Sequence, residues 1–199
     1  MFTQVLDRHY PLWLIRVLRI SFFSVLIAIA AKIAIPIPGT PIPITTQVLA
    51  VLLAGMALGP VEGAISVVAY VGAIAVGLPL DAKGIGAAAL VSPTAGFLIG
   101  FVPAAVIAGL GWHLPKYRRL VASILLGFAA LGVIYFFGLL GLLPFVGNSW
   151  TVAFAKGAVP FIFIDLGKVL LAACIVNLGQ QSWLRWMTSR LTPPQNPLK

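Results

Sequence analysis

Long apolar runs, interrupted mainly by proline and glycine, constrain this chain more than any other feature of its sequence. Residues 139–146 and 169–176 form two such runs, and 61% of the 199 residues are hydrophobic while only 9% are charged. A soluble domain carries roughly 25% charged residues, and a soluble fold of this size cannot hide so many apolar side chains. The runs exclude a soluble globular domain and a disordered chain, and they indicate a membrane protein.

Helices fit these runs better than barrel strands, because membrane strands alternate apolar and polar residues. A membrane-spanning helix needs about 20 predominantly apolar residues. We predict an all-α, polytopic membrane protein made of one integral membrane domain over residues 1–199. Its six predicted transmembrane helices cover about 14–35, 46–60, 62–79, 93–112, 119–143 and 158–180, with short cytoplasmic tails at about 1–12 and 184–199.

Proline and glycine mark the predicted helix ends. Residues 35–43 contain four prolines, which remove backbone donors and restrict φ, so this segment is predicted as an extended loop. Gly59-Pro60 ends the second span, and residues 77–79 end the third. Residues 80–91 are rich in glycine and alanine and too short to cross a membrane, so we predict a loop there.

The basic residues predict the orientation of the six spans. Nine of the thirteen fall on one side: Arg8, Arg16, Arg19, Lys116, Arg118, Arg119, Arg185, Arg190 and Lys199. Lys83 and Lys156 fall on the other side, and Lys32 and Lys168 lie within spans. The positive-inside rule places both termini in the cytoplasm. The net charge of +9 then reflects topology, and a nucleic-acid partner is not expected because the basic residues form no stripe.

Motifs of common enzyme chemistry do not occur in the sequence. It has no P-loop pattern for ATP, no H-E-x-x-H metal motif and no G-x-S-x-G nucleophile elbow. Two histidines and one cysteine make a metal site a poor interpretation. We predict no enzymatic activity, no cofactor and no metal; a membrane enzyme or an assembly factor remains the alternative of a different class.

Asp165 and Lys168 are the first candidates for a ligand site. Ionisable groups within a membrane span are costly and commonly functional. Three positions apart, these two share one helix face, and together they offer a carboxylate acceptor and an ammonium donor. A small ligand with adjacent N–H and C=O groups could bridge them. The alternative is an ion pair that only stabilises helix packing.

Four further polar residues are weaker candidates for ligand binding. Gln47 begins the second span, where it and the preceding threonines could instead cap the helix. Tyr70 could be an ordinary core aromatic residue. Asp81 and Lys83 follow the third span, where they could be solvated loop charges.

Small residues repeat at four-residue spacing along several spans. Gly96, Gly100, Ala104 and Ala108 form the longest series, and such a series lets helices pack closely or bind a partner. We favour internal packing for this one.

Three blocks of the sequence have a distinctive pattern. They are residues 36–60, with P-I-P-G-T-P-I-P-I-T-T-Q followed by L-L-A-G-M-A-L-G-P; residues 70–101, with G-L-P and S-P-T-A-G-F-L-I-G-F; and residues 160–168, P-F-I-F-I-D-L-G-K. These blocks resemble BioY, the biotin-specific substrate-binding (S) component of energy-coupling factor transporters. The chain departs from the family pattern at Ser92, Phe97, Phe163, Ile164 and Asp81. The blocks cover nearly all six predicted spans in order.

The resemblance implies a six-helix S-component bundle in a prokaryotic cytoplasmic membrane, which binds biotin near its outer face. It also implies partners: a transmembrane T component and two ATPase subunits. In S components an A-x-x-x-A motif on the first helix contacts the T component, and Ala30 and Ala34 match it. Asp165 and Lys168 would meet polar groups of biotin. The departures at Phe97 and Phe163 leave open an S component for another small vitamin.

Overall fold

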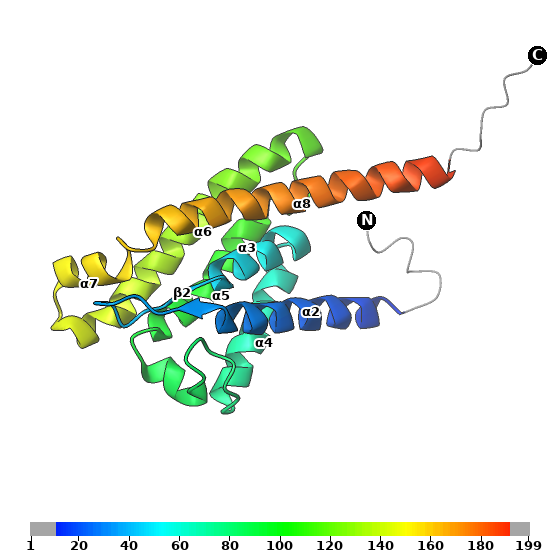
Figure 1. Ribbon diagram of the computed structural model, residues 1–199. Helices are drawn as coiled ribbons and strands as arrows, with labels where there is room; N and C mark the ends of the chain where they lie inside the picture. The colour runs from blue at the N-terminus through cyan, green and yellow to red at the C-terminus, as the bar shows by residue number, and fades with distance from the viewer. Residues whose placement is uncertain (1–10, 192–199) are drawn as a thin grey trace, which may run out of the picture.

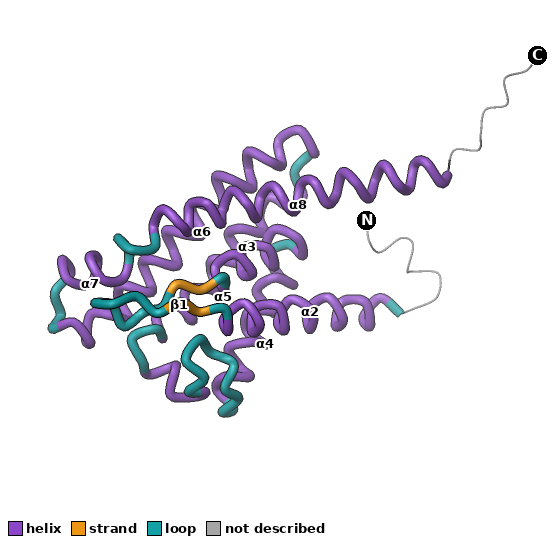
Figure 2. The backbone as a smooth tube through the Cα atoms, viewed as in Figure 1, coloured by secondary structure: helices purple, strands orange, loops and turns teal. Residues whose placement is uncertain are grey.

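The computed structural model describes residues 11–191, except for the side chains of residues 116–117 and 180–191. Its longer elements are helices, as Figures 1 and 2 show. They are α2 (Leu12–Lys32), α3 (Gln47–Leu58), α4 (Pro60–Ala75), α5 (Ala95–Gly109), α6 (Lys116–Leu142) and α8 (Ile162–Leu191). The shorter elements are β1 (Ala34–Ile35), β2 (Ile44–Thr45), the 3₁₀ helices η1 (Gly86–Val91), η2 (Leu110–His113) and η3 (Leu143–Val146), and α7 (Trp150–Gly157).

A helix occupies each of the six ranges predicted as spans, although the lengths differ. Within residues 11–191, four helical stretches are long and apolar enough to cross a membrane: residues 12–32, 95–113, 118–146 and 162–179. Helices α3 and α4 have 12 and 16 residues, fewer than the roughly 20 that a straight span needs. The membrane-protein class agrees with these helices, and the crossing of all six stays a prediction.

The junction between α3 and α4 follows the predicted Gly-Pro boundary. Gly59 adopts a φ of +87°, a conformation that glycine reaches without steric cost. Pro60 is the first residue of α4, where its missing N–H costs the helix no hydrogen bond. Glu62 lies in the first turn of α4, where the helix dipole favours a negative charge.

The proline-rich segment is non-helical, as predicted, and a short hairpin flanks it. Strands β1 and β2 pair antiparallel, with Ala34 opposite Thr45. The prediction that Ala30 and Ala34 form a motif on the first helix is wrong, because α2 ends at Lys32 and Ala34 lies in β1. Ala30 is itself buried in the core. A contact of these two residues with a partner stays a prediction, without the shared helix face that motivated it.

Three other boundaries differ from the sequence predictions. The loop predicted at residues 80–91 contains η1, and α7 occupies a connection in which no helix was expected. Only eight residues long, α7 begins with the Ser149 hydroxyl accepting a hydrogen bond from the Val152 N–H. Helix α8 begins at Ile162 and continues to Leu191, so residues 184–191 are helical. The remaining predicted tail residues, 1–10 and 192–199, lie outside the described part.

Close helix packing explains the series of small residues on α5, as predicted. A Cβ added at Gly96 would lie 2.9 Å from the Cα of Gly141 on α6, and one at Gly100 would lie 3.0 Å from the Cβ of Phe137. Ala104 and Ala108 are buried in an apolar core that gathers residues of α2, α3, α4, α5, α6 and α8. The small side chains therefore let α5 approach its neighbours closely.

Polar contacts join several helix ends at one end of the bundle. Arg19 on α2 lies 3.0 Å from the Glu62 carboxylate on α4 and forms an ion pair with it. Gly59, between α3 and α4, packs beside the Trp112 ring, which would lie 3.4 Å from a Cβ at that position. Arg119 of α6 donates to the Trp112 carbonyl. The start of α2 and the end of α8 lie at this same end in Figure 1.

Candidate functional site

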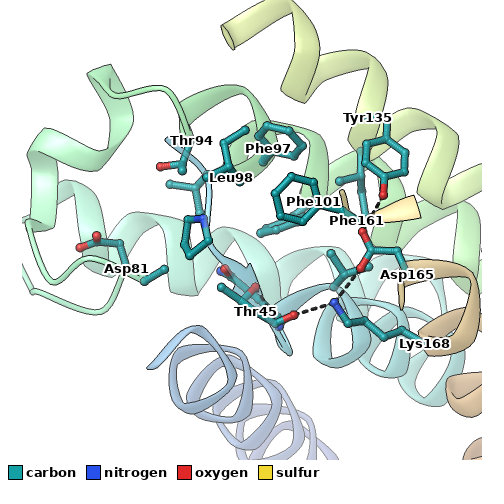
Figure 3. Close-up of a pocket in the computed structure, with 16 residues that line it drawn as sticks. Thr45, Asp81, Thr94, Phe97, Leu98, Phe101, Tyr135, Phe161, Asp165 and Lys168 are labelled. Atoms are coloured by element: carbon teal, nitrogen blue, oxygen red, sulfur yellow. Dashed lines mark hydrogen bonds and ion pairs between the residues drawn. The ribbon is translucent and has the colours of Figure 1, made fainter. Parts of the chain in front are cut away.

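A pocket lies at the opposite end of the bundle, where β2 and the starts of α3 and α8 meet α5 and α6. It holds about 630 Å³ of empty space, which includes its open mouth. Figure 3 draws its lining, which consists of Ile42, Pro43, Thr45, Gln47, Val48, Asp81, Ala82, Thr94, Phe97, Leu98, Phe101, Ile134, Tyr135, Phe161, Asp165 and Lys168.

Aromatic rings form much of the pocket wall. Phe97 and Phe101 are four residues apart on α5, so they lie on one face of that helix, and Phe161 precedes α8. Figure 3 shows these rings close to the Asp165–Lys168 pair. A wall of this kind binds the apolar body of a ligand, while a few polar groups orient it.

Asp165 and Lys168 form the ion pair that the sequence predicted. The Lys168 Nζ lies 2.6 Å from Asp165 Oδ1, and the two side chains are only 12% and 7% exposed. Asp165 is in the first turn of α8, where the helix dipole stabilises a carboxylate. The prediction put this residue deep within a span, because it started the helix four residues too early. Both side chains line the pocket.

Two contacts of this pair connect it to other elements, and the sequence analysis missed both. The Tyr135 hydroxyl on α6 donates to Asp165 Oδ2 at 2.7 Å. The Lys168 ammonium donates to the Thr45 carbonyl of β2 at 2.6 Å. Tyr135 is a tyrosine inside an apolar run, and no local sequence pattern relates it to a residue 30 positions away. The pair is therefore part of a network that joins β2, α6 and α8.

Gln47 lies on the pocket wall, and Tyr70 lies behind it. The Gln47 amide donates to the Tyr70 hydroxyl at 2.8 Å, and the Tyr70 side chain is fully buried. The structure thus brings these two candidates together, but only Gln47 reaches the pocket. The N-cap residue of α3 is Thr46, whose side chain makes no capping hydrogen bond. The Thr45 hydroxyl accepts a hydrogen bond from the Gln47 N–H.

Asp81 is buried at the pocket wall, and its carboxylate organises a turn. Its Oδ2 accepts from the Lys83 N–H at 2.9 Å, and its Oδ1 accepts from the Gly86 N–H at 2.8 Å. The interpretation of Asp81 as a solvated loop charge is therefore wrong, because the residue is only 4% exposed. The Lys83 side chain is exposed and does not line this pocket.

Lys32 was predicted within a span, and it is the last residue of α2, a helix long and apolar enough to cross a membrane. Its ammonium donates to the carbonyls of Pro79 and Asp81. Lys32 therefore fastens the end of α2 to the loop that carries Asp81. The sequence contains no signal for these contacts, because both acceptors are backbone carbonyls.

The hydrogen bonds determine which polar groups remain for a ligand. A carboxylate only accepts hydrogen bonds, so the Tyr135 hydroxyl proton is used by Asp165 and the phenol oxygen can accept. Ser92 donates to the Ala89 carbonyl, so Thr94 donates to Ser92 and its oxygen can also accept. Lys168 uses two of its three N–H groups in the contacts described above. The pocket therefore suits a ligand that has N–H donors, an acceptor oxygen and an apolar body.

Comparison with known proteins identifies what the chain is similar to. The family model described as "BioY family" matches residues 5–185. A protein of Thermotoga maritima named biotin transporter BioY is 39% identical over 162 residues, which are 80% of this chain and 92% of that protein. The biotin transporter BioY of Rhodobacter capsulatus is 41% identical over 171 residues, 78% of this chain and 87% of that protein.

A solved structure has the same fold. It is described as the S-component for biotin from an ECF-type ABC transporter, and it superposes with a TM-score of 0.73 at 25% sequence identity. The match covers 84% of this chain and 92% of the solved chain. The overall helical arrangement of this chain is therefore shared with the S-component for biotin of an ECF-type transporter.

Proposed function

Since this chain belongs to the BioY family, we propose that it is the membrane subunit that captures biotin for ATP-driven uptake by an energy-coupling factor transporter. The family consists of transporter S components and not of enzymes. The observation that carries the proposal is the buried Asp165–Lys168 pair at the wall of an aromatic pocket.

The chemistry of biotin matches the polar groups of the pocket. Its ureido ring presents two N–H donors on either side of a carbonyl, its bicyclic core is apolar, and its valerate chain ends in a carboxylate. The ureido N–H groups find acceptors in Asp165 and Thr94. The third N–H of Lys168 is available for a biotin oxygen. The rings of Phe97, Phe101 and Phe161 enclose the apolar core.

We further propose that six helices cross a prokaryotic cytoplasmic membrane and that both termini are cytoplasmic. Four helical stretches already have the required length, and α3 and α4 are shorter spans within the bundle. Large apolar side chains at Leu18, Phe22, Val25 and Ile29 are exposed along one face of α2. A face of this kind suits contact with lipid or with another membrane subunit.

The proposed partners are a transmembrane T component and two ATPase subunits. The solved neighbour is a component of an ECF-type ABC transporter, and this chain contains no P-loop. Energy for uptake would therefore come from separate subunits, while this chain binds the substrate. Uptake of labelled biotin is expected only when those subunits are expressed with it.

Titration of the purified full chain with labelled biotin tests the proposed function. We expect saturable binding in the nanomolar-to-micromolar range. Absence of saturable binding would overturn the proposal. Competition with a panel of unlabelled vitamins identifies the substrate, and displacement by a vitamin other than biotin alone would favour the rival assignment.

The rival assignment is an S component for another vitamin. It was motivated by departures from the family pattern at Phe97 and Phe163, and only the first of these supports it. Phe97 lines the pocket, so a change there alters the ligand wall. Phe163 is 84% exposed and does not line the pocket. The departure at position 163 therefore leaves the ligand wall unchanged.

A further inference from the structure

We propose that Tyr135 is a positioning residue of the biotin site and acts by holding the Asp165 carboxylate in place. The proposal rests on the proposed function, because it concerns the same pocket. Tyr135 lies on α6 and Asp165 on α8, and both line the pocket. Figure 3 shows the hydroxyl directed at the carboxylate.

The Asp165 carboxylate is held at both oxygens by donors from two different helices. Tyr135 donates to Oδ2 at 2.7 Å, and Lys168 donates to Oδ1 at 2.6 Å. Lys168 belongs to the same helix as Asp165, so it cannot orient the carboxylate relative to α6. The Tyr135 hydroxyl, which belongs to α6, orients the carboxylate relative to that helix.

The position of the hydroxyl is set by the packing of the Tyr135 ring. The ring contacts two apolar clusters, one in the centre of the bundle and one that contains Ile42, Leu142, Ala153 and Phe161. Removal of the hydroxyl alone would keep this packing and leave Oδ2 without its donor. The carboxylate could then rotate away from the orientation in which it meets a ligand N–H.

Affinity for labelled biotin in four proteins tests the proposal: wild type, Tyr135→Phe, Asp165→Asn and the double variant. A hydrogen bond to a charged group contributes more free energy than one between neutral groups. We therefore expect Tyr135→Phe to weaken biotin binding by about tenfold or more. In the Asp165→Asn background the same change should alter affinity by less than about twofold, because residues that act through one group are not additive. A purely structural role would not produce this dependence on Asp165.

Ser123→Ala is the matched control. Ser123 is also on α6, and its hydroxyl accepts a hydrogen bond from Asn177 of α8. It lies about 18 Å along the helix from Tyr135, at 1.5 Å per residue. Loss of this hydroxyl removes another contact between the same two helices, and we expect biotin affinity to stay at the wild-type value.

The outcomes separate this proposal from the proposed function. If wild type binds no biotin, the proposed function fails and the role of Tyr135 fails with it. If wild type binds and Tyr135→Phe has wild-type affinity, or loses affinity equally in both backgrounds, only the positioning role is overturned. If Tyr135→Phe does not fold, rescue of folding by Asp165→Asn supports the role, and failure in both backgrounds contradicts it.

Discussion

At the scale of single residues, the Asp165 carboxylate joins the local sequence to the tertiary structure of the pocket. Its ion pair with Lys168 comes from helical spacing, whereas its second donor comes from another helix. Two buried charges are costly unless each finds a partner, and removing one partner leaves the other unpaired. The pair is therefore sensitive to any change at either residue.

The first prediction concerns this pair. Asp165→Asn and Lys168→Ala are each expected to weaken biotin binding by more than about tenfold, or about 1.4 kcal/mol, because each removes a charged group from the pocket wall. Equilibrium binding of labelled biotin to the purified variants measures the change. If both variants keep full affinity, the pair only stabilises helix packing.

A second prediction concerns Gly138, which makes room for a wall residue. A Cβ at this position of α6 would overlap the Phe97 ring. The ring is a side chain that can yield, and displacement from α6 moves it toward the pocket that it lines. Gly138→Ala is therefore expected to reduce biotin affinity severalfold. Isothermal titration of the detergent-solubilised protein with biotin would measure this loss of affinity.

Gly132→Ala is the control for Gly138→Ala, because it lies on the same helix and a Cβ there meets nothing within 4 Å. Its affinity should equal that of wild type. Equal affinities in both alanine variants would contradict the idea that Gly138 determines the shape of the pocket.

At the scale of elements, the contact between α5 and α6 positions the aromatic wall relative to Tyr135. Backbones approach closely at Gly96 and Gly141, so this contact depends on the absence of side chains. The loop that carries Asp81 is held differently, by the Lys32 ammonium at the end of α2. Close backbone packing at glycines positions the aromatic wall. Hydrogen bonds from Lys32 to backbone carbonyls position the wall that contains Asp81.

The third prediction tests the helix contact. In Gly96→Ala the new Cβ would lie 2.9 Å from the Gly141 Cα, and α5 and α6 would have to separate. Overpacking of this kind costs roughly 1–3 kcal/mol, so the thermal unfolding temperature should fall. Gly72→Ala on α4, where a Cβ meets nothing within 4 Å, is the control. Identical unfolding temperatures for the two variants would exclude a critical role for this contact.

At the scale of the whole molecule, charge is distributed unequally between the two ends. Arg16, Arg19 and Arg119 belong to the end where α2 and α6 begin, and Arg19 pairs there with Glu62. The end that carries the pocket has four lysines, Lys32, Lys83, Lys156 and Lys168, together with Asp81 and Asp165. Among the described residues the arginines therefore lie at the end that the positive-inside rule assigns to the cytoplasm, and the orientation stays a prediction.

The fourth prediction tests that orientation in intact cells. In a Cys174→Ala background, Lys156→Cys should react with a membrane-impermeant maleimide added outside, because we place α7 on the outer face. Arg118→Cys should react only after the cells are opened. The reverse labelling pattern would invert the proposed topology and place the pocket toward the cytoplasm.

The sequence by itself determined the membrane class, the approximate positions of the six longer helices and the Asp165–Lys168 pair. These properties depend on composition, on the conformational limits of proline and glycine, and on residues three or four apart, so they are readable locally. It also named Gln47 as a candidate for ligand binding, because Gln47 is a polar residue at the start of the second predicted span.

Only the tertiary structure decided how the pocket is assembled. Tyr135 meets Asp165 across 30 residues, and Lys168 meets the Thr45 carbonyl across 123. Asp81 is buried and Lys83 is not, although they are two positions apart in one loop. The end of α2 at Lys32 removed Ala34 from the first helix. These outcomes depend on which helix faces pack together, and packing between distant segments leaves no periodic signal in one sequence.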